Sequence, residues 1–132
     1  PNPLSDAPFP VKMRPWTEEC ESEELSHFTV RLMPLPATPW AKGKCGFKAL
    51  QYMAHGVPVV LSPVGVNQEI VIHQVSGYHA TTHQEWSTAI LALLQDAHHR
   101  KEVGEAGHRR VLEAYSIERW IAPWKNAVRG AR

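Results

Sequence analysis

With 132 residues, a hydrophobic fraction of 43% and a formal net charge of +1, the chain fits one domain of ordinary size. Its 14 basic and 13 acidic residues nearly balance, which argues against a nucleic-acid partner, and no run of about eighteen apolar residues predicts a transmembrane segment. The two cysteines are too few for a disulfide scaffold, so a reducing, cytoplasmic setting is expected.

The N-terminal part of the chain predicts two short strands around a helix. Residues 1–10 are rich in proline and begin without a methionine, so we interpret the chain as a piece of a larger protein. Residues 11–14 alternate in polarity and are a strand candidate, and residues 29–33 are a second one. Between them, Thr17 is expected to cap a helix over residues 18–27.

The centre of the chain, residues 43–69, carries the most informative pattern, GKCGFKALQYMAHGVPVVLSPVGVNQE. It follows a loop in which prolines predict an extended, irregular path. Gly46 precedes a predicted helix over residues 47–55, and Gly56 stands where a left-handed residue ends a helix at low cost. Residues 57–61 then predict a short, fully buried strand.

Strands and helices continue to alternate after this centre. A turn at residues 62–65 leads to a short predicted helix over residues 67–73, and residues 78–80 predict another strand. This alternation indicates an α/β fold with a parallel sheet and helices on both faces.

The last fifty residues predict a helical tail. Thr82 and Glu85 have the spacing of a capping box, and Asp96 is placed to cap the long helix that follows. Ser116 is expected to cap a final helix, which Pro123 should kink or shorten.

Two loops are expected to face one crevice. In parallel α/β sheets, ligands bind at the carboxyl ends of the strands, and here that edge carries the loops over residues 33–46 and 62–67. The helix after Gly46 begins with backbone N–H groups that have no partner within the helix, and its dipole favours negative charge. The pattern therefore predicts an anion site that suits a diphosphate.

These segments resemble the C-terminal half of a family 4-type, or group 1, glycosyltransferase with the GT-B fold. The resemblance is carried by VKMRPW, FTVRLMPLPATPW, the 43–69 pattern, SGYHATTHQEWSTAILALL and EAGHRRVLEAYS, which together cover most of the chain. It implies a single, partial donor-binding domain with a Rossmann-like sheet. This domain would comprise an irregular start at residues 1–10, an α/β part at residues 11–80 and a helical tail at residues 81–132.

The resemblance also implies a function. Such enzymes transfer a sugar, here expected to be a hexose, from a nucleotide-sugar donor to an acceptor that an N-terminal domain holds. This chain lacks that acceptor domain and two strand–helix units of the donor domain, so it is expected to be inactive alone. No cofactor is expected, because the nucleotide-sugar is a substrate, and the eight histidines show no zinc-motif spacing.

The sequence departs from the family pattern at two positions. Many members carry two glutamates eight positions apart, and here Gly43 and Gln51 occupy those places. Gln51 can still donate and accept hydrogen bonds to ribose hydroxyls, whereas the sugar-binding role of the first glutamate is lost. Lys48 is expected near the site instead.

The resemblance and the residue chemistry together give a set of candidate donor-binding residues. Backbone N–H groups of the two glycine loops would bind phosphate, and lysines would neutralise its charge. For Asn67 a simple helix-capping role is the alternative. No catalytic residue is identified and no metal ligand is expected. The candidates are Lys44, Gly46, Phe47, Lys48, Gln51, Gly65, Val66 and Asn67.

A second class of function stays open from the residues alone. The chain could be a non-catalytic α/β module that self-associates or binds a protein partner. An exposed strand at residues 11–13 and the apolar side chains Trp120, Ile121 and Trp124 of the last helix would favour a homodimer.

Overall fold

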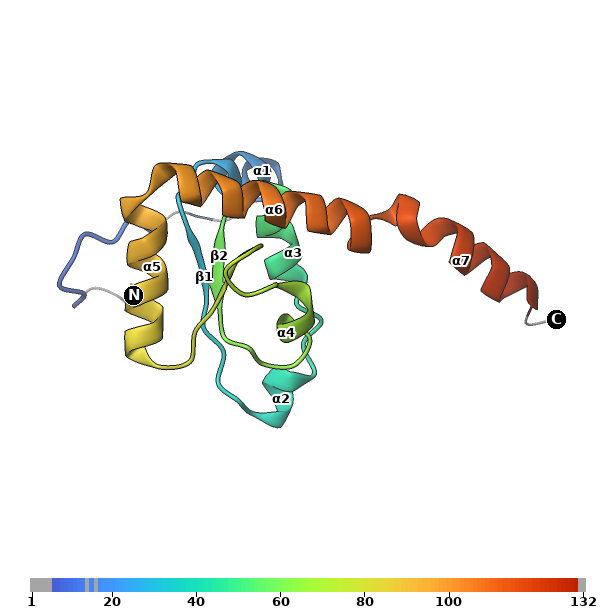
Figure 1. Cartoon of the computed structure of the whole chain (residues 1–132), viewed down its shortest axis with the longest axis horizontal. Helices are drawn as coiled ribbons and strands as arrows, with labels where there is room; N and C mark the ends of the chain where they lie inside the picture. Colours follow the sequence, from blue (N-terminus) through green and yellow to red (C-terminus); the bar gives the residue numbers. More distant parts are fainter. Residues whose placement is uncertain (1–5, 14, 16, 131–132) are drawn as a thin grey trace.

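The computed structural model describes residues 6–13, 15 and 17–130 (Figure 1). Three strands, β1 (Arg31–Met33), β2 (Val59–Leu61) and β3 (Tyr78–His79), form one sheet in the order β1-β2-β3. Both strand pairs are parallel, with Leu32 opposite Val60 and Val60 opposite Tyr78. The predicted parallel α/β sheet is confirmed.

Seven helices belong to the described part of the chain, and several begin at the predicted caps. The Thr17 side chain accepts a hydrogen bond from the N–H of Cys20 at 3.3 Å, and Thr82 and Glu85 form the complete capping box. Asp96 accepts from the N–H of His99 at 2.9 Å. The helices are α1 (Glu18–Ser26), α2 (Pro39–Lys42), α3 (Phe47–Ala54), α4 (Asn67–Ile70), α5 (His83–Gln95), α6 (Ala97–Tyr115) and α7 (Ile117–Gly130).

Two predictions for the first forty residues are wrong. Residues 11–13 form no strand, since the prolines at positions 10 and 15 lack the backbone N–H that a paired strand uses, and position 14 lies outside the described residues. The proline-rich loop is not irregular throughout, since it contains α2. The Thr38 hydroxyl accepts from the N–H of Ala41 at 3.2 Å, and Pro39 occupies the first helical position, where its fixed φ favours a helix.

Two further predictions concern helix ends. The predicted helix over residues 67–73 stops at Ile70, because Val71 is extended and the N–H of Ile72 bonds to the Ser76 hydroxyl at 2.9 Å. The last helix runs through Pro123 to Gly130, so the proline does not shorten it.

The two faces of the sheet are covered by different helices. Side chains of β2 alternate between two buried clusters, with Val59 and Leu61 on one side and Val60 on the other. Val59 and Leu61 pack with Ala49 and Met53 of α3 and with residues after β2, whereas Val60 packs with Ala89 and Leu93 of α5. The expected arrangement of helices on both faces is therefore confirmed.

Helix α6 closes the amino-terminal edge of the sheet. It lies across α5 and α3 at one end of the molecule (Figure 1). Gly104 fits directly against the carbonyl oxygen of Gly56, just before β2, and Gly107 lies beside the carbonyl of Ser76, just before β3. Because α6 occupies the amino-terminal edge, only the carboxyl edge is free to hold loops and a ligand.

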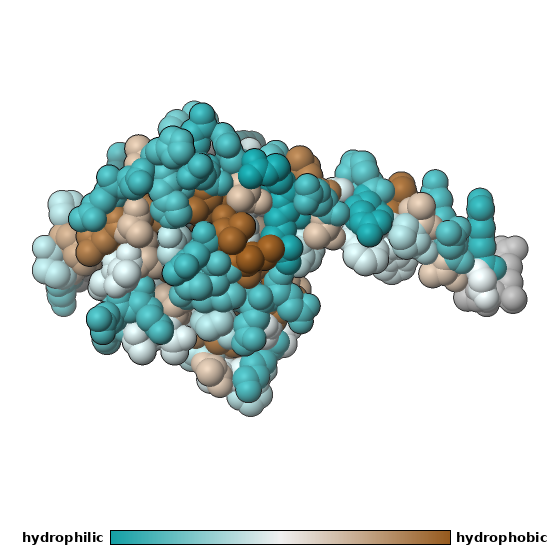
Figure 2. Space-filling view, in the orientation of Figure 1, coloured by the Kyte–Doolittle hydropathy of each residue, from teal (hydrophilic) through white to brown (hydrophobic). Residues whose placement is uncertain are grey.

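Helix α7 extends away from the rest of the protein as a narrow arm (Figures 1 and 2). None of its residues is buried. Its large apolar side chains recur every three or four residues and are all exposed, Trp124 to 68%. They are Ile117, Trp120, Ile121, Trp124 and Val128. This apolar stripe, named the α7 stripe below, completes the predicted helical tail.

Candidate functional site

The N-terminus of α3 is an open hydrogen-bonding site. Gly46 adopts a left-handed conformation (φ 67°) and caps the helix without a side chain. Its carbonyl accepts from the N–H groups of Ala49 and Leu50, so the helix begins immediately after it. In the part of the chain that the structure describes, the N–H groups of Phe47 and Lys48 have no acceptor. They point out of the helix start, where its dipole favours an anion.

The second glycine loop, residues 62–66, lies directly against this helix start. An added Cβ on Gly46 would stand 2.3 Å from the Ile70 side chain and 3.2 Å from that of Val66. An added Cβ on Gly65 would stand 2.5 Å from the carbonyl oxygen of Lys42. The two loops do meet, as expected, but they meet in van der Waals contact. The space for a ligand therefore lies beside them rather than between them.

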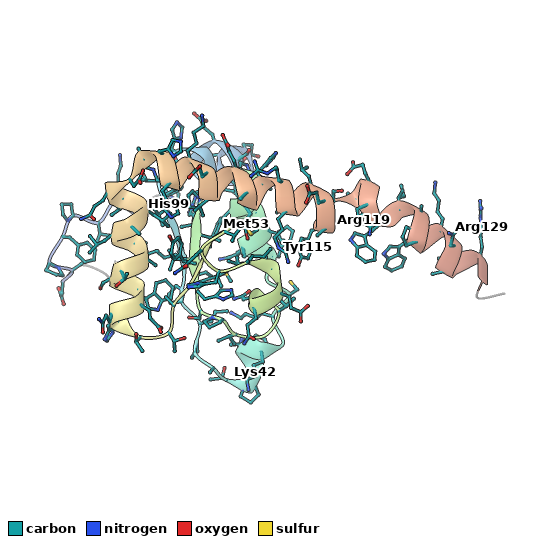
Figure 3. The ribbon with its side chains drawn as sticks, viewed as in Figure 1. Lys42, Met53, His99, Tyr115, Arg119 and Arg129 are labelled. Atoms are coloured by element: carbon teal, nitrogen blue, oxygen red, sulfur yellow. The ribbon has the colours of Figure 1, made fainter. Side chains whose placement is uncertain are left out.

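That space is a hollow of about 580 Å³ between the end of β1 and the start of α3, named the β1–α3 hollow here. Lys44 and Lys48 both line it and both are exposed. In the described residues, neither lysine forms an ion pair with a carboxylate. Lys42 lies nearby at the tip of α2, at the end of the molecule opposite α6 (Figure 3). The hollow is lined by Leu32, Met33, Pro34, Leu35, Gly43, Lys44, Cys45, Gly46, Phe47, Lys48, Tyr52 and Asn67.

Five of the eight candidate residues thus surround one hollow, and three do not line it. Gln51 lines a neighbouring hollow of about 610 Å³ against α1, and Lys48 and Tyr52 border both. Gly65 and Val66 are held by their packing against the other loop, although in the described structure their N–H groups have no acceptor.

Asn67 has a structural task. It is 1% exposed, and its side-chain amide donates to the carbonyl of Ser62 at 3.2 Å. It lies inside α4 and Val66 occupies the cap position, so the alternative role of Asn67 as N-cap is wrong. The bond ties the two ends of the 62–67 loop together and fixes the wall of the β1–α3 hollow.

Two arginines that sequence reasoning passed over also support the site. Arg110 of α6 donates from Nε to the carbonyl of Ile70 at 2.6 Å and from Nη2 to that of Glu69, so it caps the C-terminal end of α4. The Arg31 guanidinium lies over the Phe28 ring, 3.1 Å from its centroid, and burial lowers its pKa. The Arg110 contact joins residues forty positions apart, and the Arg31 contact belongs to no recognised motif. No sequence pattern therefore identifies either of them.

The described residues lack two other features, a metal-binding cluster and a membrane-spanning helix. No group of three or more histidine, cysteine, aspartate or glutamate side chains is placed to hold a metal ion. Of the helices described, none is both long enough and apolar enough to cross a membrane.

Comparison with known proteins gives one family match and a match in fold. A sequence model of the family described as "Glycosyl transferases group 1" matches residues 9–96, about two thirds of the chain. No curated protein matches. A similar solved structure is the C-terminal domain of the group 1 family glycosyl transferase LpcC from Francisella tularensis, with 24% identity and a TM-score of 0.52. The match covers 65% of this chain and 44% of that one, and at this identity it supports the fold alone.

Proposed function

Because this chain belongs to the group 1 glycosyl transferases, we propose that it binds a nucleotide-sugar donor in the β1–α3 hollow, as part of an enzyme that transfers a hexose to an acceptor. The observation that carries the proposal is the coincidence, in one hollow, of a glycine-led helix N-terminus and two lysines without carboxylate partners. The rival idea of a non-catalytic module has no support from the comparisons.

The chemistry of donor cleavage suits these groups. When the sugar leaves a nucleotide-sugar, negative charge grows on the departing diphosphate. N–H groups of Phe47 and Lys48 and the ammonium groups of Lys44 and Lys48 would stabilise that charge, with no metal ion required. A volume of about 580 Å³ is within the range of small-molecule sites.

Gln51 extends the proposal to the nucleoside. Its hollow joins the β1–α3 hollow at Lys48 and Tyr52, so a donor with its diphosphate at Lys48 could place the ribose near Gln51. A glutamine offers both a donor and an acceptor to the ribose hydroxyls, as a carboxylate does not. Gly65 and Val66 would contribute backbone N–H groups from the adjoining loop.

We further propose that this chain needs a separate acceptor domain for turnover. Its matched structure is a C-terminal domain, of which it covers 44%. Sugar transfer requires two substrates held in reacting geometry, and one hollow on an open sheet edge does not position both. The exposed α7 stripe is the surface that we propose packs on the acceptor domain.

Calorimetric titration of the 132-residue chain with UDP and with pyrophosphate tests the donor site. We expect saturable binding that the double substitution Lys44→Ala and Lys48→Ala weakens by roughly tenfold or more, since two charge-assisted contacts are lost. Lys125→Ala combined with Arg129→Ala removes the same two positive charges from the α7 arm and should leave the affinity unchanged. Equal affinity in the double variant and the wild type would refute the site, and rapid sugar transfer by the chain alone would refute the need for a partner.

A further inference from the structure

A second hollow lies at the carboxyl edge, on the other side of the 62–67 loop. Its volume is about 610 Å³, and it is bounded by β3, by the first turns of α5 and by the segment before β3. Asn67 of the loop lines the β1–α3 hollow, whereas Pro63 lines this one. We name it the β3–α5 hollow. Its lining is Pro63, His73, Gln74, Tyr78, His79, Thr81, Thr82, Gln84, Glu85, Thr88 and Ala89.

The side chains of this hollow are mostly polar, and none of them carries a permanent positive charge. The lining contains hydroxyl, amide and imidazole groups and one carboxylate, but no lysine or arginine. Gln74, Gln84 and Thr88 are exposed, and their side chains form no hydrogen bond with another described residue. They therefore offer donors and acceptors to a ligand at several points around the hollow.

The carboxylate is fixed and charged. One oxygen of Glu85 accepts from the N–H of Thr81 at 2.7 Å and from that of Thr82 at 2.9 Å. These two bonds, that of Thr82 first, lower the pKa of the Glu85 carboxyl, so it is ionised at neutral pH. Its second oxygen remains an acceptor. No lysine or arginine lines the hollow to offset this negative charge, which therefore opposes the binding of a phosphate.

The opposite wall is made of rings. His73 and His79 stack with centroids 5.5 Å apart, and Tyr78 meets His73 edge-on at 5.7 Å. The N–H of His79 donates to Nδ1 of His73 at 2.9 Å, so in neutral His73 the proton is on Nε2, which can donate. Nε2 of His79 is buried without a partner among the described residues, which leaves one polar group unsatisfied at this wall.

Both walls are held rigidly before any ligand arrives. The turn before β3 is closed by the N–H of Gln74, which donates to the carbonyl of Gly77 at 2.8 Å. Gly77 is packed so closely that an added Cβ would stand 2.8 Å from the carbonyl oxygen of Val59. The capping box fixes the α5 wall. Such preorganisation reduces the entropy lost on binding.

We propose that the β3–α5 hollow binds a neutral sugar residue of a glycan. A sugar ring presents many hydroxyl groups, which both donate and accept, and apolar C–H faces that pack on rings. Exposed amides and hydroxyls, the second oxygen of the Glu85 carboxylate and the histidine and tyrosine rings match both features. The absence of lysine and arginine from its lining separates this site from the β1–α3 hollow, so the inference stands whether or not that hollow binds a donor.

NMR titration of the ¹⁵N-labelled chain tests the proposal. The probes are the methyl α-glycosides of glucose, mannose and galactose, then N-acetylglucosamine, and pyrophosphate as the anionic counterpart. We expect at least one sugar to cause saturable shifts of the amide signals of Thr81, Thr82 and Glu85. The double substitution Gln84→Ala and Thr88→Ala should weaken the binding of that sugar by about fivefold or more, while the signals of all other residues stay unchanged.

Lys44→Ala with Lys48→Ala serves as the control and should leave the sugar shifts intact. If no sugar gives saturable shifts at these amides, or if the Gln84 and Thr88 variant binds as well as the wild type, the proposal is wrong. Pyrophosphate shifts centred on this hollow would also overturn it. Loss of pyrophosphate binding at Lys48 would count only against the donor site.

Discussion

Gly46 and Gly56 share the same φ of 67° but have different surroundings. A Cβ on Gly46 would collide with Cδ1 of Ile70, a core side chain that is 1% exposed, whereas a Cβ on Gly56 would meet nothing within 4 Å. Gly56→Ala should therefore cost only the left-handed strain, about 1 kcal/mol. Gly46→Ala should cost about 2–4 kcal/mol, since overpacking adds to the strain.

Urea denaturation of the two variants measures this difference, because their backbone strain is matched and only the collision differs. Equal destabilisation would mean that α4 moves away from Gly46 easily. In that case the packing between the two glycine loops would rearrange more easily than their close contact in the structure indicates.

A second prediction at the residue scale concerns pH. Burial, and to a lesser extent the neighbouring His73, lowers the pKa of His79 below its ordinary value of 6.5, while the carbonyl groups of Asn67 and Val71 act in the opposite direction. Below pH 6.5 the unfolded chain therefore takes up more protons at this residue than the folded chain does. The contribution of His79 to stability should be complete above that pH and should decline as the pH falls toward the lowered pKa.

Denaturation midpoints of the wild type and of His79→Gln across this pH range test the assignment. Glu85 also faces this cluster, and its own titration lies at lower pH because its pKa is lowered. On acidification from about pH 7.5 to about pH 5.5, the variant should lose less stability than the wild type does. An identical loss in both proteins would show that other groups carry the pH dependence.

At the scale of elements, the contact of α6 with the loop before β2 depends on one residue. A Cβ on Gly104 would stand 2.1 Å from the carbonyl oxygen of Gly56, a backbone atom that cannot rotate away. Gly107, one turn later, has its nearest neighbour at 3.2 Å, the carbonyl oxygen of Ser76. Alanine gains about 1 kcal/mol over glycine inside a helix, so only a close contact can make these changes costly.

We expect Gly104→Ala to destabilise the protein by about 2–4 kcal/mol and Gly107→Ala by less than about 1 kcal/mol. Thermal unfolding followed by circular dichroism separates the two. A neutral or stabilising Gly104→Ala would show that α6 does not lie this close to the sheet.

Which elements could be predicted depends on where their hydrogen bonds lie. The starts after Thr17, Thr82 and Asp96 were predictable because each cap bonds a residue only three positions away. The end of α4 was not, because its last carbonyls are capped by Arg110, forty residues further along the chain, and the next N–H bonds to the Ser76 hydroxyl. The pair Thr38–Pro39 is a recognisable helix start for α2, but the surrounding prolines favoured the prediction of an extended loop.

The candidate site was predictable to the same extent. Parallel topology alone brings the two glycine loops to one edge, and this is confirmed. The direct contact of Gly65 with Lys42, which displaces the hollow sideways, depends on backbone packing that no residue pattern encodes. Gln51 lies on the next turn of α3 beyond Lys48 and faces α1 instead, which spacing on one helix does not reveal.

For the whole molecule, the α7 stripe is the most prominent exposed apolar surface among the described residues. Trp120 is 50% exposed and Trp124 is 68% exposed, on an arm that contacts the protein only at its start. Leu32 on the open edge of β1 is also 49% exposed. Monomeric proteins rarely leave such a contiguous patch exposed, and covering it gains roughly 25 cal/mol per Å². Without its proposed acceptor domain, the chain should therefore cover the stripe with a second copy.

Sedimentation and light scattering at micromolar concentration test this self-association. We expect a species heavier than the monomer that Trp124→Glu returns toward monomer, because a buried charge without a partner is costly. Asn126→Glu adds the same charge to the polar side of α7 and should leave association unchanged. A wild-type chain that stays monomeric would show that the stripe needs no cover. Association that both glutamate variants keep would place the contact elsewhere, with the open edge of β1 at Leu32 as the next surface to substitute.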